Sequence, residues 1–253
     1  MRYINACIIA FAMYSKIPMP KAGWEKENMR YALCFFPWVG AVVGGCFYLW
    51  GIYGRAIPVG TQLYAVILTV IPILVTGGIH MDGFLDTMDA LSSWQTKERR
   101  LEILKDSHAG AFAVIGGCMY FLLYYGLVSE LETENISIVS LGFFFSRCLS
   151  GYGVTVFPCA KESGLAAAFA DGADKKRAGN ILLLETAVCI AGLLWNNAYA
   201  GGVVVMVSFL VFFGYYRMSQ EKFGGITGDL AGYFLQLCEL GMLGMLVLGQ
   251  WVR

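Results

Sequence analysis

The chain contains few charged residues. Of its 253 residues, 14% are Asp, Glu, Lys or Arg, against roughly 25% in an average soluble domain. Hydrophobic residues make up 58%, and they are concentrated in uncharged blocks at 31–53, 56–79 and 109–129. Each block reaches the roughly 20 residues that a helix needs to cross a bilayer. The composition therefore argues against an ordinary soluble domain and predicts an integral membrane protein.

The chain also lacks the marks of several other protein classes. Its formal net charge is zero, which gives no indication of nucleic-acid binding, and none of its eight cysteines forms a CxxC pair. We interpret the cysteines as small buried hydrophobic residues rather than as disulfides or zinc ligands. No secretory signal is evident. The apolar start at 3–13 runs into Lys16 and is too short to span, so we expect an interfacial or re-entrant helix there.

Seven stretches are candidate membrane spans, and two of them share one uncharged run. The run 186–216 is too long for a single ordinary span. Asn196-Asn197, near its middle, suits a tight hairpin. The sequence thus predicts an all-α, polytopic membrane helix bundle of about seven transmembrane helices plus the N-terminal helix. The expected spans are 31–53, 57–77, 109–128, 136–158, 180–196, 198–216 and 230–252.

The distribution of basic residues assigns a side to each connection. Lys and Arg concentrate in cytoplasmic loops. With the N-terminus inside, 15 of the 18 basic residues fall in inside segments, Lys161 among them, while Arg253 falls outside. The outside loop 129–135 carries three glutamates and no basic residue. We expect one integral membrane domain over 1–253, with a cytosolic loop at about 78–108.

Three aspartates stand at the start of that inside loop. Asp82, Asp86 and Asp89 are spaced i, i+4 and i+7, so on a helix they share one face. Their charges repel, and a divalent cation such as Mg²⁺, which prefers hard oxygen ligands, would offset the repulsion. A solvated acidic turn is the alternative, although apolar Phe84 lies among them. His80 could ligate a metal, shuttle a proton or simply be hydrogen-bonded.

Other polar residues on the same predicted side suit phosphate binding. Arg100 and Lys105 belong to a basic cluster, which suits phosphate capture but also an ordinary inner-face loop or anionic headgroups. The segment 224–229, GGITGD, contains Thr227 and Asp229. Its glycines could cradle a phosphate or make only a turn. Metal, basic groups and a residue that orients a hydroxyl are what phosphoryl transfer needs.

Three charged residues, Arg147, Glu185 and Glu239, fall inside predicted spans. Arg147 lies near the middle of 136–158, where an arginine needs a partner or a water-filled cavity. A buried ion pair with Glu185 or Glu239 is the structural interpretation. Glu239 could instead complete a metal site or act as a base, as could Asp229, for which helix capping is the alternative.

Four stretches together resemble one family, cobalamin synthase, also called adenosylcobinamide-GDP ribazoletransferase. Residues 77–89, GGIHMDGFLDTMD, are similar to its GGLHLDGLADTxDG signature. Residues 11–20, 100–107 and 224–239 are similar to its FLTRIPVP, R-x-EIMKDS and GGxTGD…E stretches, in the same order over nearly the whole chain. Lys16 replaces an arginine of the family pattern.

The resemblance implies a reaction in cobalamin biosynthesis. α-Ribazole or its 5′-phosphate attacks adenosylcobinamide-GDP, GMP leaves, and adenosylcobalamin or its 5′-phosphate forms. The resemblance also implies Mg²⁺ and the inner membrane of a prokaryote. It assigns the metal to Asp82 and Asp86, with Asp89 as outer support, and leaves Asp229 or Glu239 to activate the hydroxyl. The candidate substrate-binding residues are Arg100, Lys105, Arg147, Thr227 and His80.

Two other functions stay open as alternatives. A CDP-alcohol phosphotransferase also begins its pattern with Asp-Gly, as at Asp82-Gly83, but continues with Ala-Arg, whereas Phe84-Leu85 follow here. A transporter can also have seven spans and buried charges, but it would usually show related halves, and none are visible. The corrin is large, so a site between subunits of a homo-oligomer also remains open.

Overall fold

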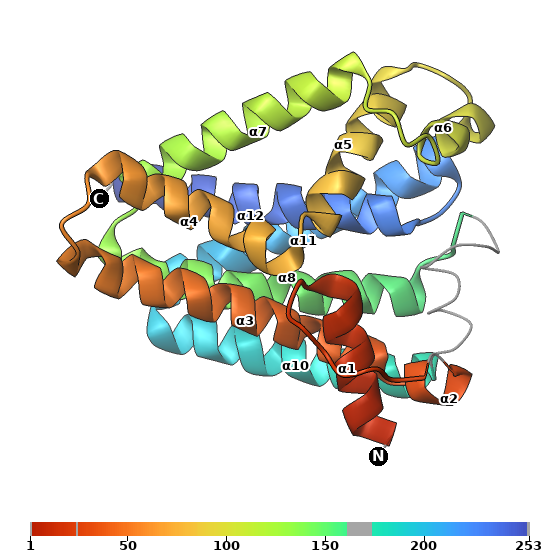
Figure 1. Ribbon diagram of the computed structural model, residues 1–253, viewed down its shortest axis with the longest axis horizontal. Helices are drawn as coiled ribbons and strands as arrows, with labels where there is room; N and C mark the ends of the chain where they lie inside the picture. Colours follow the sequence, from red (N-terminus) through yellow and green to blue (C-terminus); the bar gives the residue numbers. More distant parts are fainter. Residues whose placement is uncertain (1, 24, 161–173, 252–253) are drawn as a thin grey trace.

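The computed structural model describes residues 2–23, 25–160 and 174–251, and its regular elements there are all helices. Lys161 and Arg253 lie outside the described residues. Figure 1 shows long helices arranged side by side, crossed by α1 and α5. The elements are α1 (Arg2–Tyr14), α2 (Lys26–Met29), α3 (Ala32–Tyr53), η1 (Gly54–Ala56), α4 (Thr61–Thr76), α5 (Ile79–Ser92), α6 (Lys97–Ile103), α7 (Ala111–Glu130), η2 (Thr133–Asn135), α8 (Ile136–Val156), α10 (Lys175–Asn196), α11 (Ala198–Phe223) and α12 (Gly228–Trp251).

A helix occupies each of the seven predicted spans, namely α3, α4, α7, α8, α10, α11 and α12. In the described part of the chain, five helices are long and apolar enough to cross a membrane, or six if α4 and α5 count as one broken span. α4 is short, at 16 residues, and α8 carries Arg147 and several serines. The predicted all-α, multi-pass bundle is confirmed, with a span count close to the expected seven.

Two features of the apolar pattern also take their predicted form. The N-terminal segment folds as α1, a helix of 13 residues that is too short to span. The run 186–216 breaks at Asn197, whose side chain accepts a hydrogen bond from the backbone N–H of Ala200 at 3.0 Å. That bond caps the first turn of α11. One residue therefore separates α10 from α11, as the expected hairpin requires.

Small residues allow α3 to lie directly against α8. A Cβ added at Gly40 would collide with the carbonyl oxygen of Phe143, and one added at Gly44 would collide with that of Ser140. Glycines four residues apart let membrane helices approach closely where apolar burial alone provides little driving force. The contact between α3 and α8 is therefore part of the centre of the bundle.

The connections between helices collect at two ends of the bundle. At one end, the guanidinium of Arg100 donates to the carbonyl oxygen of Lys222 at 3.4 Å, and Arg30 pairs with Asp174 at 2.8 Å. We call this the basic end. It joins the segment before α3 to the start of α10, and α6 to the end of α11. These connections were predicted to share a side of the membrane, and the structure brings them together.

The opposite end is closed by a different set of contacts. The side-chain amide of Gln250 donates to the carbonyl oxygen of Glu130 at 3.0 Å, and its oxygen accepts from the side chain of Asn135 at 2.8 Å. Ser137 hydrogen-bonds Asn196 at 3.2 Å, at the α10–α11 turn. The loop that the charge pattern placed outside therefore lies at the end away from the acidic segment.

A pair of glycines turns α4 into α5. Gly77 and Gly78 have φ values of 68° and 82°, in the left-handed region that glycine adopts without the strain of a Cβ. The helix axes bend by 96° across this pair. α5 therefore does not continue the path of α4 but crosses the bundle (Figure 1).

Candidate functional site

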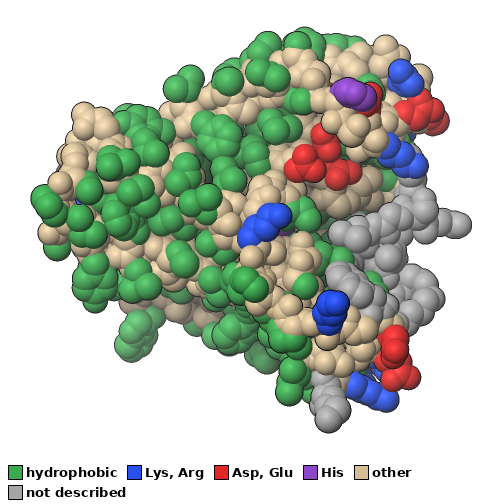
Figure 2. Space-filling view, in the orientation of Figure 1, with side chains coloured by type: hydrophobic (Ala, Val, Ile, Leu, Met, Phe, Trp, Pro, Cys, Tyr) green, Lys and Arg blue, Asp and Glu red, His purple; other side chains and the backbone are tan. Residues whose placement is uncertain are grey.

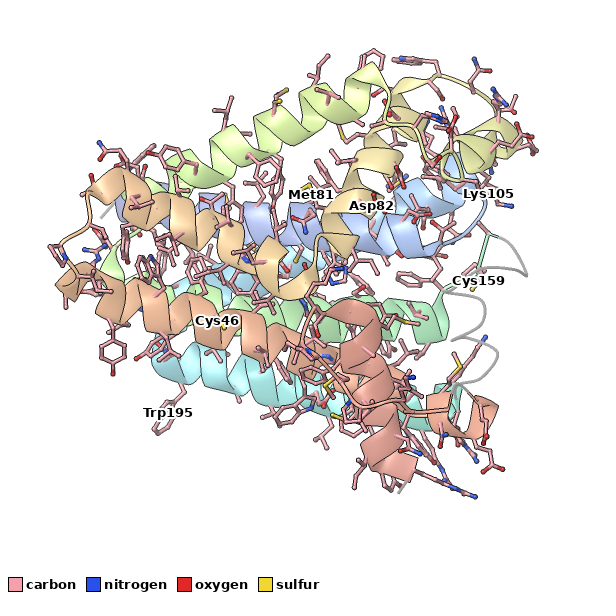
Figure 3. The ribbon with its side chains drawn as sticks, in the orientation of Figure 1. Cys46, Met81, Asp82, Lys105, Cys159 and Trp195 are labelled. Atoms are coloured by element: carbon pink, nitrogen blue, oxygen red, sulfur yellow. The ribbon has the colours of Figure 1, made fainter. Side chains whose placement is uncertain are left out.

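α5 and α12 cross at a very short distance. A Cβ added to Gly83 would lie 2.8 Å from the Cα of Asp229, and one added to Gly232 would lie 2.8 Å from the carbonyl oxygen of His80. Glycine at both positions permits this approach. The crossing brings the start of α12 against the part of α5 that carries Asp82, which Figure 3 labels.

Three carboxylates gather at this crossing. Asp82 is exposed, while Asp86 and Asp229 are half-buried. Burial, followed by the charges of Asp82 and Asp229, raises the pKa of Asp86 to about 6. Such a rise is expected where like charges crowd a partly desolvated carboxyl. Figure 2 shows acidic side chains grouped toward the charged end of the molecule, with hydrophobic side chains over much of the opposite part of this view.

Asp89 has a different role from its two predecessors. Its carboxylate accepts hydrogen bonds from the backbone N–H of Gly110 and, at 2.9 Å, from that of Ala113. These N–H groups belong to the first turn of α7, where no intrahelical acceptor is available. A negative charge at a helix N-terminus is also favourable. Asp89 thus caps α7, and Asp229 rather than Asp89 joins Asp82 and Asp86 at the crossing.

The carboxylates do not form a ready-made metal cage. In the described ranges, no three His, Cys, Asp or Glu side chains come close enough to hold a metal ion by themselves. Mg²⁺ does not require such a cage, because it usually keeps several waters and binds through one or two carboxylates plus substrate phosphates. Asp82 and Asp86 supply hard oxygen donors, and a divalent cation would relieve their repulsion. This donor set fits Mg²⁺ held jointly by the protein and a phosphorylated ligand.

A cavity of about 130 Å³ lies beside the carboxylates, and its lining includes Asp82, Asp229 and His80. His80 is only 4% exposed. Its ring centroid lies 6.1 Å from that of Tyr14 and 5.7 Å from that of Phe36. Its Nε2 is buried without a hydrogen-bond partner among the described residues. The acidic cluster and the cavity therefore form one continuous site, with a buried imidazole in its wall.

The other residues proposed for phosphate binding are placed differently from one another. Arg100 donates to the carbonyl oxygen of Lys222, near the end of α11, where helix carbonyls carry partial negative charge. Thr227 accepts a hydrogen bond from the N–H of Leu230 at 3.2 Å and so caps α12. Lys105 is exposed at the basic end, where Figure 3 labels it. Of these three predicted residues, Lys105 is the one exposed to solvent.

Arg147 and Glu239 form the buried ion pair that was the structural interpretation of the sequence. Their side chains are 1% and 2% exposed, and the guanidinium contacts Glu239 Oε1 directly. The hydroxyl of Ser146 donates to the same oxygen at 3.1 Å. Glu185, the other candidate partner, instead accepts from the indole N–H of Trp38 at 3.1 Å.

The position of this ion pair also separates it from the acidic cluster. Glu239 follows Asp229 by ten residues on α12, which corresponds to about 15 Å along the helix. Neither Arg147 nor Glu239 contributes to the cavity lining. Their placement therefore does not support the predicted roles of Arg147 in pyrophosphate binding and of Glu239 as a base.

Sequence reasoning missed several cavity-lining residues. Tyr14, Phe36 and Ser150 line the cavity from α1, α3 and α8. Aromatic and small residues are common throughout the apolar blocks of this chain, so no local pattern distinguishes Phe36 or Ser150. Tyr14 lies in the stretch 11–20, which was singled out only through the family resemblance.

The chain is similar to known proteins along nearly its whole length. The family model for cobalamin-5-phosphate synthase matches residues 6–247. The adenosylcobinamide-GDP ribazoletransferase of Lachnoclostridium phytofermentans is 48% identical over 247 residues, covering 98% of this chain and 94% of that protein. Those of Clostridium perfringens (strain ATCC 13124) and Brevibacillus brevis are 30% and 31% identical, covering 98% of this chain and 98% and 99% of those proteins. No solved structure matches the chain.

Proposed function

The chain belongs to the cobalamin-5-phosphate synthase family, and we propose that it is an adenosylcobinamide-GDP ribazoletransferase. It joins α-ribazole, or its 5′-phosphate, to adenosylcobinamide-GDP. A ribose hydroxyl attacks the phosphorus next to the cobinamide, and the P–O bond to GMP breaks. The products are adenosylcobalamin, or its 5′-phosphate, and GMP, while the hydroxyl proton is released.

The observation that carries this proposal is the crossing of α5 and α12. It brings Asp82, Asp86 and Asp229 beside a cavity at the basic end of the bundle. Phosphoryl transfer depends mainly on positioning and on charge stabilisation. Carboxylates that can share a cation with a diphosphate supply the charge stabilisation, and the adjacent space for an organic group supplies the positioning.

We assign Mg²⁺ to Asp82 and Asp86. When bound there, the ion would neutralise charge on the diphosphate oxygens. Asp229, on the facing helix, would accept a hydrogen bond from the attacking hydroxyl and orient it. A loose transition state requires little proton abstraction, so a half-buried carboxylate is sufficient for this task.

The charged surroundings of the site support its assignment to the cytosolic face of the inner membrane. Most Lys and Arg residues of the chain fall in the segments predicted to be inside, and such segments are retained on the cytoplasmic side. Lys105 is exposed at this end. It would attract the anionic substrate and contribute positive charge near its phosphates.

The activity is tested directly with membranes that contain the protein. Incubation with adenosylcobinamide-GDP, α-ribazole and Mg²⁺ should release GMP and yield a corrinoid with its lower ligand attached. Chelation with EDTA should stop the reaction, and added Mg²⁺ should restore it. Absence of both products from well-folded wild-type protein would overturn the proposed activity.

The metal assignment is tested with Asp82→Asn. This variant should insert and fold normally but lose at least about 100-fold in turnover, because removing even outer support of a metal site costs roughly 10–100-fold. Glu132→Gln is a matched control, since Glu132 is an exposed carboxylate at the opposite end of the bundle. Wild-type turnover by Asp82→Asn would exclude a metal-binding role for Asp82.

A further inference from the structure

We infer that the cavity beside the acidic cluster binds the planar base of the nucleoside substrate, with the buried Nε2 of His80 as its polar contact. This inference rests on the proposed function and identifies which part of which substrate occupies the cavity. Three properties of the cavity support it, namely its size, the character of its walls and the unpartnered Nε2 of His80.

The size of the cavity selects a small, flat group. Its volume is about 130 Å³, close to an engineered cavity of roughly 150 Å³ that accepts benzene. Drug-sized ligands occupy pockets of about 300–1,000 Å³. An aromatic base therefore matches the space, whereas a corrin ring is far too large and must remain outside.

The walls of the cavity are mainly apolar and partly aromatic. Leu33, Val154 and Leu235 contribute aliphatic surface from α3, α8 and α12. The ring of Tyr14 is stacked on the imidazole at 25°, the ring of Phe36 meets it edge-on at 64°, and the Tyr14 and Phe36 rings contact each other with centroids 4.4 Å apart. Aromatic groups favour such offset and edge-to-face contacts, so a planar base would extend this arrangement.

One buried nitrogen in the cavity wall needs a hydrogen-bond partner. The Nε2 of His80 is buried and has no partner among the described residues, and an unpaired buried polar atom is costly. A neutral imidazole can present an N–H at this atom. The base of α-ribazole is glycosylated at one imidazole nitrogen and retains the other as an acceptor. The N–H of His80 thus offers a donor for the acceptor on the base.

Guanine, the other aromatic base among the substrates, fits these walls less well. It has several donors and acceptors, most of which would be left unpaired against Leu33, Val154 and Leu235. The exposed carboxylate of Asp82 marks the solvent side of the cavity. A ribazole with its base inside would therefore direct its ribose toward Asp82 and Asp229, where we propose that the hydroxyl reacts.

The hydrogen bond is tested with His80→Phe in purified full-length protein reconstituted into nanodiscs. The variant keeps a ring against Tyr14 and Phe36 but loses the donor. We expect the KM for α-ribazole and its Kd by calorimetry to rise about three- to tenfold, as for the loss of one hydrogen bond. The KM for adenosylcobinamide-GDP should not change, whereas a general loss of folding would affect both substrates.

Filling of the cavity is tested with Gly228→Leu. Gly228 lines the cavity, and a Cβ added there meets no atom within 4 Å. The larger side chain should raise the Kd for α-ribazole about tenfold or more, as expected for an excess methylene in an apolar pocket. Gly214→Leu in α11 is the matched control, because a Cβ there also meets nothing within 4 Å, and its affinity should equal that of the wild type.

The outcomes separate this inference from the proposed function. If wild-type protein transfers ribazole but His80→Phe and Gly228→Leu keep the wild-type affinity for α-ribazole, the inference is wrong and the activity stands. If GMP competes with α-ribazole for binding, or if only the KM for adenosylcobinamide-GDP rises, guanine occupies the cavity and the inference is again wrong. If wild-type protein neither turns over nor binds α-ribazole, both proposals fail.

Discussion

The buried pair of Arg147 and Glu239 gives a prediction whose magnitude follows from the structure. The two side chains are 1% and 2% exposed. Arg147 also donates to the carbonyl oxygen of Phe143 at 2.9 Å. We consider Arg147→Met, Glu239→Leu and the variant that combines them, because the two single variants each leave one charge without its counter-ion while the combined variant leaves none.

Removing one partner of a buried ion pair costs about 3–5 kcal/mol, whereas replacing both with apolar residues is often neutral. Each single variant should therefore lose about 3–5 kcal/mol, equivalent to a decrease in Tm of about 6–20 °C for a chain of this size. The combined variant should remain close to the wild type. The resulting coupling energy between positions 147 and 239 should exceed about 3 kcal/mol.

The measurement is unfolding by SDS in mixed micelles, followed by circular dichroism, with Tm recorded at one fixed scan rate. Single variants that each cost less than about 1 kcal/mol, or a combined variant as unstable as the sum of the two, would refute the account of Arg147 and Glu239 as a mutually dependent pair.

The same variants also test the catalytic role that the sequence suggests for Glu239. If the pair is structural, the folded combined variant should transfer ribazole at a rate within about tenfold of the wild type. A hundredfold loss corresponds to about 2.7 kcal/mol of transition-state stabilisation. Such a loss in protein of normal stability would show that Arg147 or Glu239 takes part in the reaction.

Two further predictions concern Asp89 and the orientation of the bundle. Asp89→Ala should lower the free energy of unfolding by about 1–2 kcal/mol through loss of the α7 cap, yet leave the Mg²⁺ affinity measured by calorimetry unchanged. Asp86→Asn should instead weaken Mg²⁺ binding at little cost in stability. Weaker Mg²⁺ binding by Asp89→Ala, with Asp86→Asn binding Mg²⁺ as the wild type does, would place Asp89 in the metal site. A reporter that is active only in the cytosol should work when fused at Lys105 and fail at Glu132, and the opposite readout would invert the proposed topology.

Features set by local sequence were predictable from the chain alone. The spans follow from uncharged runs of sufficient length, because a helix satisfies its own backbone polar groups within a membrane. The break between α10 and α11 follows from Asn196-Asn197, and the bend before α5 from Gly77-Gly78, whose unusual backbone angles favour glycine. Each of these signals lies within a few residues of the structure that it specifies.

Features set by packing between distant segments were not predictable in the same way. The spacing of Asp82, Asp86 and Asp89 correctly gave a shared helical face, but it could not show that the first turn of α7 meets Asp89. Glu185 and Glu239 were equivalent partners for Arg147 in the sequence, and α8 packs against both of their helices, so only the three-dimensional contacts show that Arg147 pairs with Glu239 while Glu185 meets Trp38. The cavity likewise depends on residues from several helices, so no single segment reveals it.

The short turn at Asn197 also affects how the chain can enter the bilayer during biosynthesis. Because one residue joins α10 to α11, the two helices can insert together as a hairpin, with only the turn crossing to the far side. No charged residue occurs from 186 to 216, and Arg217 and the basic start of α10 stay at the side of entry. Between 186 and 216 insertion therefore avoids the roughly 2.5–3.5 kcal/mol that each Lys, Arg or Asp costs at the centre of a membrane helix, while Glu185, near the middle of α10, accepts a hydrogen bond from Trp38.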